Sequence, residues 1–151
     1  MRLWLRLLIV VRGIEAELRD KLRRDHNTTL PRFDVMSALS RHPEGLKMSE
    51  LSGVLRVSNG NVTGIADRLS DEGLVERIAV PGDRRAMRLR LTSDGLAEFE
   101  GQAAAHETWI NDVLSGISPE EARAMAQRLQ AFADAAQPAE DTRIKDTADA
   151  Q

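Results

Sequence analysis

Apolar residues recur at intervals of three and four through the first two dozen positions of the chain. This spacing places them on one face of a helix and predicts a first helix over residues 2–25. Near its start the opposite face is apolar too, because Leu5, Leu8 and Ile9 lie there. A helix end that is apolar all round must be covered on several sides, so we expect the rest of the domain and a second chain to bury it.

Shorter helical segments follow. Pro31 suits the first turn of a helix over about residues 31–41, and the apolar spacing predicts two more, near 49–55 and 59–72. Ser58 is a natural N-cap for the last of these. The residues expected to face the core are Phe33, Val35, Met36, Leu39, Leu51, Val54, Leu55, Val62, Ile65, Ala66 and Leu69.

After this helix the pattern changes from helical to alternating. The runs "LVERIAV" and "MRLRL" predict two strands, and "PGDRRA" between them predicts the turn of a hairpin. In the second run Met87, Leu89 and Leu91 share one face, while Arg88 and Arg90 share the other. The solvent side of this hairpin is therefore expected to be basic.

Two more helices are predicted after the hairpin. Thr92 caps a long one whose apolar stripe has coiled-coil-like spacing, and Ser118 with Pro119 begins another that runs to about Ala136. Residues 137–151 are polar and aperiodic, so we expect a disordered tail. The stripe is Leu96, Phe99, Ala103, His106, Ile110, Val113 and Ile117, and the last helix is expected to bury Ala122, Met125, Ala126, Leu129, Phe132 and Ala133.

Composition limits the classes of function. With 42% hydrophobic and 30% charged residues, the 151-residue chain has the makeup of one folded domain. The absence of cysteine excludes disulfides, thiolate metal sites and thiol redox switching. The histidines at 26, 42 and 106 lack metal-ligand spacing, and no phosphate loop or activated nucleophile is present. We therefore expect no metal, no cofactor and no enzyme activity.

The first residues, "MRLWLRLLIVVRG", superficially resemble a signal peptide. Arginines at positions 2, 6 and 12 interrupt the apolar run, and no small-residue cleavage pattern follows. We interpret the stretch as a helix and expect a cytoplasmic protein without a membrane span.

The formal net charge of −3 is unevenly distributed. Residues 1–46 carry 9 basic and 6 acidic side chains, residues 47–91 carry 8 and 6, and residues 92–151 carry 4 and 12. A polyanion would therefore meet the middle of the chain rather than its acidic end. The alternative is that the acidic residues only solvate exposed helices.

Two short helices, a tight turn and a hairpin make a winged helix-turn-helix, whose second helix enters the DNA major groove. Glycines on the exposed face of that helix allow close approach, and short polar side chains near its start can hydrogen-bond bases or phosphates. The alternative is that Ser58 and Asn61 only cap the helix. The candidate contacts are Ser58, Asn59, Gly60, Asn61, Thr63, Gly64 and Arg68.

The hairpin turn supplies the second group of candidates. Arg84 and Arg85 lie at its tip, where a long cation can reach into a narrow minor groove. Asp83 is close enough to hold one of them by a charge-assisted hydrogen bond. The alternative is a solvated charged turn without a partner.

The stretch from "LSGVLRVSNGNVTG" to "DRRAMRLRLT" resembles the DNA-binding core of the MarR family (multiple antibiotic resistance regulators). The flanking helices match that family's order over about residues 2–136. The resemblance implies a mainly α fold with a small β-hairpin wing: dimerisation helices at 1–28 and 92–136, and a winged helix-turn-helix at 29–91. "TLPRFDVMSAL" with "VSNGNVTG" is similar to a subgroup that controls aromatic-acid catabolism.

By this resemblance the protein is a homodimeric DNA-binding regulator, a repressor on a pseudopalindromic operator. Its release would come from a small organic anion, an aromatic acid or its coenzyme A thioester. The alternative function is a winged helix that contacts another protein and does not bind DNA. The residues expected to line the effector pocket are Trp4, Leu8, Arg12, Arg32, Phe33 and Met36.

Overall fold

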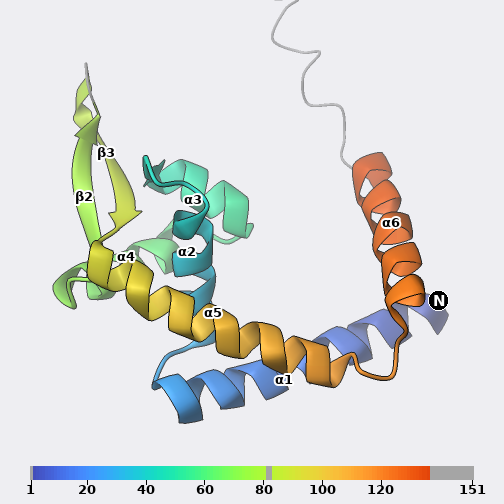
Figure 1. The fold of residues 1–151 in the computed structure, drawn as a ribbon. Coiled ribbons are helices and arrows are strands. Elements are labelled where there is room, and N and C mark those ends of the chain that lie inside the picture. Colours follow the sequence, from blue (N-terminus) through green and yellow to red (C-terminus); the bar gives the residue numbers. More distant parts are fainter. Residues whose placement is uncertain (1, 81–82, 137–151) are drawn as a thin grey trace, which may run out of the picture. The chain divides into compact units, whose positions relative to one another are not determined.

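The computed structural model describes residues 2–80 and 83–136, and the side chains of all of these except 83–86 and 136. It confirms the predicted fold class, because the chain is mostly helical with one small antiparallel sheet (Figure 1). The chain divides into two compact units, Met1–Val113 and Leu114–Gln151. The elements are α1 (Arg2–His26), α2 (Leu30–Ser40), β1 (Leu46–Lys47), α3 (Met48–Leu55), α4 (Asn59–Asp71), β2 (Val75–Val80), β3 (Asp83–Leu91), α5 (Ser93–Val113) and α6 (Pro119–Ala136).

The first four helices begin and end within one residue of their predicted limits. The predicted stripe of α5 is wrong at its end, because the helix stops at Val113 and leaves Ile117 outside. Here the chain turns, and the Ile117 N–H donates to the Leu114 carbonyl at 2.9 Å. Gly116, followed closely by the cap Ser118, favours a turn over continued helix.

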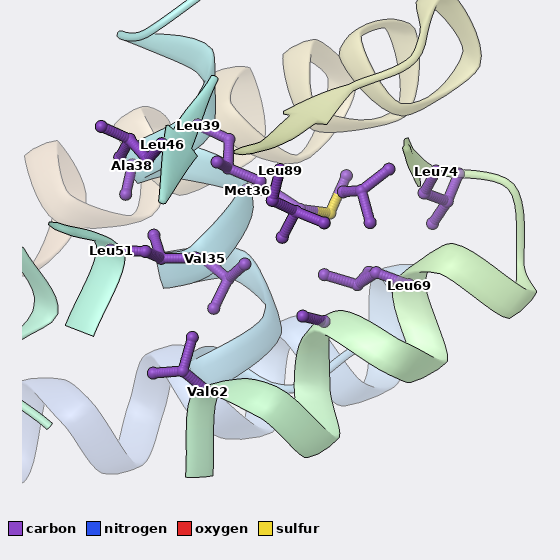
Figure 2. Close-up of a cluster of buried hydrophobic side chains, with 12 residues drawn as sticks. Val35, Met36, Ala38, Leu39, Leu46, Leu51, Val62, Leu69, Leu74 and Leu89 are labelled. Atoms are coloured by element: carbon purple, nitrogen blue, oxygen red, sulfur yellow. The ribbon is translucent and has the colours of Figure 1, made fainter. Parts of the chain in front are cut away.

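The hydrophobic core lies in the first unit, where side chains of α2, α3, α4 and the sheet meet (Figure 2). Val62, Ala66 and Leu69 lie on one face of α4 and are completely buried. Their burial decides which face of α4 remains exposed, since side chains half a turn away point outward. The rest of the cluster is Val35, Met36, Ala38, Leu39, Leu46, Leu51, Leu74, Val75 and Leu89.

Val54 was expected to face the core and instead is 50% exposed. The buried residues of α3 are Leu51 and Ser52, and Val54 lies about 110° around the helix from the middle of that face. The correction follows from helical geometry, because an eight-residue helix offers too few apolar positions to locate its inner face by spacing alone.

The sheet has the strand order β1-β3-β2, and both pairings are antiparallel. The two-residue strand β1, which is too short to show alternation in the sequence, pairs Leu46 with Leu89. Leu89 is buried at the centre of the sheet, whereas Met87 on the same face is exposed. The hairpin therefore continues beyond the core as a projecting wing (Figure 1).

The junction between α4 and the sheet is fixed to the start of α5. The Thr92 N–H donates to the Leu74 carbonyl at 3.1 Å. The Thr92 hydroxyl donates to the Gly73 carbonyl at 2.7 Å and accepts the Gly95 N–H at 3.0 Å. Gly73, at φ +74°, ends α4, so one threonine joins the end of one helix to the beginning of another.

α5 packs against α2 and α1 through a face that includes part of the predicted stripe. Leu96 of the stripe is 43% exposed, whereas the polar Gln102 is buried. The His106 ring stacks on Phe33 with ring centroids 4.6 Å apart. Phe99 of the stripe also contacts Phe33, with ring centroids 5.5 Å apart, so spacing located the face that α2 covers but missed Gln102 on it.

The second unit contains α6, which begins as the sequence predicts. The Ser118 and Glu121 side chains and backbone N–H groups bond reciprocally at 2.8–3.3 Å, forming a capping box. The prediction that α6 buries its apolar face does not hold within the single chain, because Met125, Leu129 and Phe132 are all exposed.

Gly95→Ala is expected to destabilise the fold. A Cβ at Gly95 would lie 1.9 Å from the Leu74 carbonyl oxygen, so one backbone must move away from the other. Overpacking of this kind costs about 1–3 kcal/mol. Urea unfolding followed by circular dichroism measures it.

Gly101→Ala is the matched control in the same helix. A Cβ at Gly101 meets no atom within 4 Å, so alanine should stabilise the helix by about 1 kcal/mol. If both variants shift the unfolding midpoint in the same direction, the contact at Gly95 does not constrain the fold.

Stability is also expected to fall as the pH drops below about 6.5, the usual histidine pKa. Burial against Phe33 lowers the pKa of His106. The unfolded chain therefore binds a proton before the folded chain does, and the folded state loses stability as the pH falls toward the lowered pKa. His106→Phe keeps an aromatic ring on Phe33 and should flatten the pH dependence of the unfolding free energy. An unchanged slope in the variant would show that His106 does not cause it.

Candidate nucleic-acid interface

The first turn of α4 presents unpaired polar groups on the surface. Ser58 precedes it in extended backbone geometry, and its hydroxyl makes no capping bond. The N–H groups of Asn61 and Val62 donate to the Ser58 carbonyl, whereas those of Asn59 and Gly60 reach no acceptor in the described part of the chain. Free N–H groups at a helix start favour an anion such as a phosphate.

The exposed face of α4 is smooth. A Cβ added at Gly60 or Gly64 would meet no atom within 4 Å, so neither glycine is required by packing inside the chain. Thr63 lies on the same face, and its hydroxyl donates to the Asn59 carbonyl at 2.9 Å. Each glycine costs the helix about 1 kcal/mol relative to alanine, and a close approach from outside would account for that cost.

The charges on α4 are arranged unequally. Asp67 is paired with Arg77 of β2, which lies beside it. Arg68 is exposed, and no ion pair reaches it from the residues that the structure describes. The acidic group of the outer face is thus neutralised from within the fold, while the arginine remains available.

The turn before α4 contains a residue that the sequence reasoning missed. Arg56 has φ 54° and ψ 40°, a left-handed conformation that glycine usually supplies at the end of a helix. Its N–H bonds the Gly53 carbonyl at 3.3 Å, and that of Val57 bonds the Ser52 carbonyl at 3.2 Å. A residue other than glycine is strained in this conformation. The sequence could have indicated this strain, because α3 is followed by an arginine and not by a glycine.

The far end of α4 is held by an ion pair. Both terminal nitrogens of Arg32 on α2 donate to the Glu72 carboxylate, one of them at 2.7 Å. The hydrogen bond from Arg32 lowers the pKa of Glu72. Arg32, expected in the effector pocket, therefore fixes α2 to the C-cap of α4.

The predicted wing contacts lie at the edge of what the structure describes. Asp83, Arg84 and Arg85 belong to the backbone of β3, and their side chains lie outside the described residues. Nearer the core, Arg90 donates to Glu76 across the hairpin at 2.7 Å. Arg90 therefore pairs along the sheet.

The structure does not gather the expected effector residues into one pocket. Met36 is completely buried in the core, and Phe33 is buried against His106. Trp4 and Arg12 are exposed on α1, and Leu8 is half-buried there. Trp4 lies fourteen residues before Leu18, where α1 is buried, a distance of about 21 Å along the helix.

Three buried polar atoms on α2, on α5 and in the turn before α2 have no hydrogen-bond partner among the described residues. They are the Thr28 hydroxyl oxygen, the Arg32 Nε and the Gln102 Oε1. Glu98 lies close to two of these side chains. Its carboxylate accepts a hydrogen bond from Gln102 Nε2 at 3.0 Å. The hydrogen bond to Glu72 is the first cause of the raised pKa of Arg32, and the charge of Glu98 adds to it.

Residues 2–80 and 83–136 contain neither a cluster of metal ligands nor a membrane-spanning helix. Among them, no three histidine, aspartate or glutamate side chains gather as metal ligands. None of the helices described there has both the length and the apolar content needed to cross a bilayer.

A family model described as the MarR family matches residues 26–86. The HTH-type transcriptional repressor MdtR of Bacillus subtilis is 30% identical over 141 residues, which cover 93% of this chain and 90% of that protein. Alignments with two other curated HTH-type regulators cover 63% and 62% of their lengths.

Solved structures of MarR proteins are also similar to this chain. A MarR family transcriptional regulator from Silicibacter pomeroyi is 31% identical, with a TM-score of 0.75 over 90% of this chain and 94% of that one. A mutant MarR from E. coli complexed with operator DNA has a TM-score of 0.77 over 87% and 94% of the two chains; at 23% identity it is a likeness of fold.

The order of the helices and strands supports the match to this family, and so does the 30% identity over nine tenths of the repressor MdtR. The chain belongs to the MarR family of winged-helix transcriptional regulators.

Proposed function

We propose that this protein is a homodimeric repressor that binds a pseudopalindromic operator and leaves it when a small organic anion binds. The effector would be an aromatic acid or its coenzyme A thioester. The observation that carries the DNA-binding part is the first turn of α4, which exposes free N–H groups beside a glycine face without protein neighbours.

The first turn of α4 fits the major groove. The groove is about 12 Å wide and admits a helix whose N-terminal residues reach the base edges. Asn59 and Asn61 have side-chain amides that can both donate to and accept from bases. Without Cβ atoms at Gly60 and Gly64, the backbone of α4 can approach the DNA more closely than an ordinary helix.

Arginines around this helix would contact phosphates. Arg68 is exposed on α4, and Arg56 lies on the turn before it. By their position in the sequence, Arg84 and Arg85 would extend the contact to the minor groove, with Asp83 holding Arg85 in place. Phosphate contacts fix register and orientation, while base contacts near Asn59 would supply specificity.

Dimerisation is supported by apolar surface that one chain leaves uncovered. Ile9 is 71% and Phe132 is 74% exposed, and neighbouring apolar side chains on α1 and α6 are exposed as well. Apolar patches of this kind mark interfaces. A two-fold dimer would place two copies of α4 in successive major grooves, about 34–36 Å apart.

Release by an organic anion would act through Arg32. A carboxylate that reached Arg32 would compete with Glu72, and the aromatic group could pack near Phe33 and His106. Loss of the Arg32 bond would free the C-cap of α4 from α2. The unpaired Thr28 and Gln102 oxygens would supply polar contacts for the same ligand.

Affinity for duplex DNA should fall steeply with salt, by about 0.9 in log K per unit of log salt for each phosphate contacted. Arg68→Ala should weaken binding and reduce that slope by about 1 per subunit. Fluorescence anisotropy of a labelled duplex between low and high salt measures both quantities, and Arg85→Ala tests the wing in the same way.

Arg123→Ala is the control, because it removes the same charge from α6, where Arg123 pairs with Glu120. Its slope should match that of the unchanged protein. A flat salt response of the unchanged protein would instead favour the alternative, a winged helix that contacts a protein.

Gly64→Ala should stabilise the free protein by about 1 kcal/mol and weaken its DNA binding. The added methyl group meets open space inside the chain but would meet the DNA in a close approach. Gly53→Ala on α3 is matched, since a Cβ there also meets nothing within 4 Å. Thermal unfolding and duplex affinity are measured for both; unchanged affinity in Gly64→Ala would mean that α4 does not approach DNA closely.

A further inference from the structure

A cleft of about 350 Å³ opens between α2 and the turn that joins α3 to α4. Asp34 and Val35 of α2 line one side, Leu55 and Val57 line the turn, and Asn61 and Ile65 of α4 close it. Its size is at the lower end of the range for small-molecule sites. All of its lining belongs to the first unit.

The charge in this cleft is of one sign. Asp34 is its only ionisable lining residue, and no lysine or arginine lines it. No hydrogen bond or ion pair from the described residues reaches the Asp34 carboxylate. Its surroundings raise the pKa of Asp34, first by burial and then through the charge of Glu15. Asp34 is exposed at the cleft, and an unpaired carboxylate there attracts a cation and repels an anion.

The rim of the cleft is apolar and uncovered. Val57 is 45% exposed, although it stands beside the completely buried Val35 and Val62 in the same lining. An apolar group placed on Val57 and Ile65 would remove this surface from water. The cleft thus combines one carboxylate with an apolar wall. These two features are complementary to an amphipathic ammonium ion.

We propose that this cleft binds a small organic monocation, with its ammonium group on Asp34 and its apolar group against Val57 and Ile65. A single aromatic ring on a short alkylammonium has this chemistry. This site is separate from the Arg32 region, and its ligand has the opposite charge to the proposed effector.

Occupancy would be coupled to DNA binding, a step that rests on the proposed function. Asn61 lies in the first turn of α4 and also lines the cleft. A ligand that contacts Asn61 withdraws it from a base edge, so the ligand weakens DNA binding. By linkage, DNA must weaken ligand binding by the same factor.

The binding test uses the full chain without DNA and compares 2-phenylethylammonium with the neutral 2-phenylethanol by isothermal titration calorimetry. The ammonium should bind more tightly, and Asp34→Asn should weaken it by about tenfold or more, the loss expected for a charge-assisted bond. The alcohol should bind both proteins equally, which also shows that the variant is folded.

Asp20→Asn, a carboxylate on α1 outside the cleft, is the control and should leave both affinities unchanged. As the pH falls through the raised pKa of Asp34, ammonium affinity should decline while alcohol affinity stays constant. Equal binding of ammonium and alcohol, or no effect of Asp34→Asn, would overturn the proposal.

A second arm adds the operator duplex. If the ammonium binds through Asp34 but leaves duplex affinity unchanged, the site stands and its coupling to α4 is refuted. If no duplex binds at all, the proposed function fails while the calorimetric result remains valid.

Discussion

The constraint on which the rest of the structure depends is the contact of two backbones at Gly95 and Leu74. No side chain fits between them, since a Cβ at Gly95 would lie 1.9 Å from the Leu74 carbonyl oxygen. Thr92 closes the same junction with bonds to both sides. Because this turn ends α4 and begins β2, the start of α5 positions the helix and the wing together. A displacement of α5 would therefore move both as one body, whereas the two could not be tilted separately without breaking the Thr92 bonds.

α4 performs two tasks on opposite faces. Its inner face is committed to the core through Val62, Ala66 and Leu69, so rotation of the helix about its axis would bury polar groups. Its outer face gives up helix propensity at two glycines. Asp67 of α4 and its C-cap Glu72 pair with neighbouring elements, Asp67 with Arg77 and Glu72 with Arg32. The helix is thus held by the core and by ion pairs at its sides, and its first turn leaves Asn59, Gly60 and Asn61 exposed.

The sequence predicted the first four helices closely because they have strong local signals, such as Pro31 at the start of α2 and Gly73 after the end of α4. It failed where a contact between distant residues decides. The burial of Gln102 depends on α2 and α1 lying over α5, and the pairing of Arg32 with Glu72 joins residues forty positions apart. Neither follows from periodicity. The buried face of α4 could be predicted from its spacing. The roles of the recognition and effector residues stay predictions, although Trp4 is exposed on α1 while Phe33 is buried beside His106.

α2 connects these features, because two of its residues with opposite charge point in different directions. Arg32 and Asp34 are two positions apart and so lie about 200° apart around the helix. Arg32 bonds the C-cap of α4, and Asp34 lines the cleft next to the first turn of α4. On the proposed function, an anion would act on one end of α4 and a cation on the other, both through the same helix. Two ligands that favour the same displacement of α4 must increase each other's affinity, and two that favour opposite displacements must reduce it. The balance of the two would then set operator affinity, with no contact between the ligands themselves.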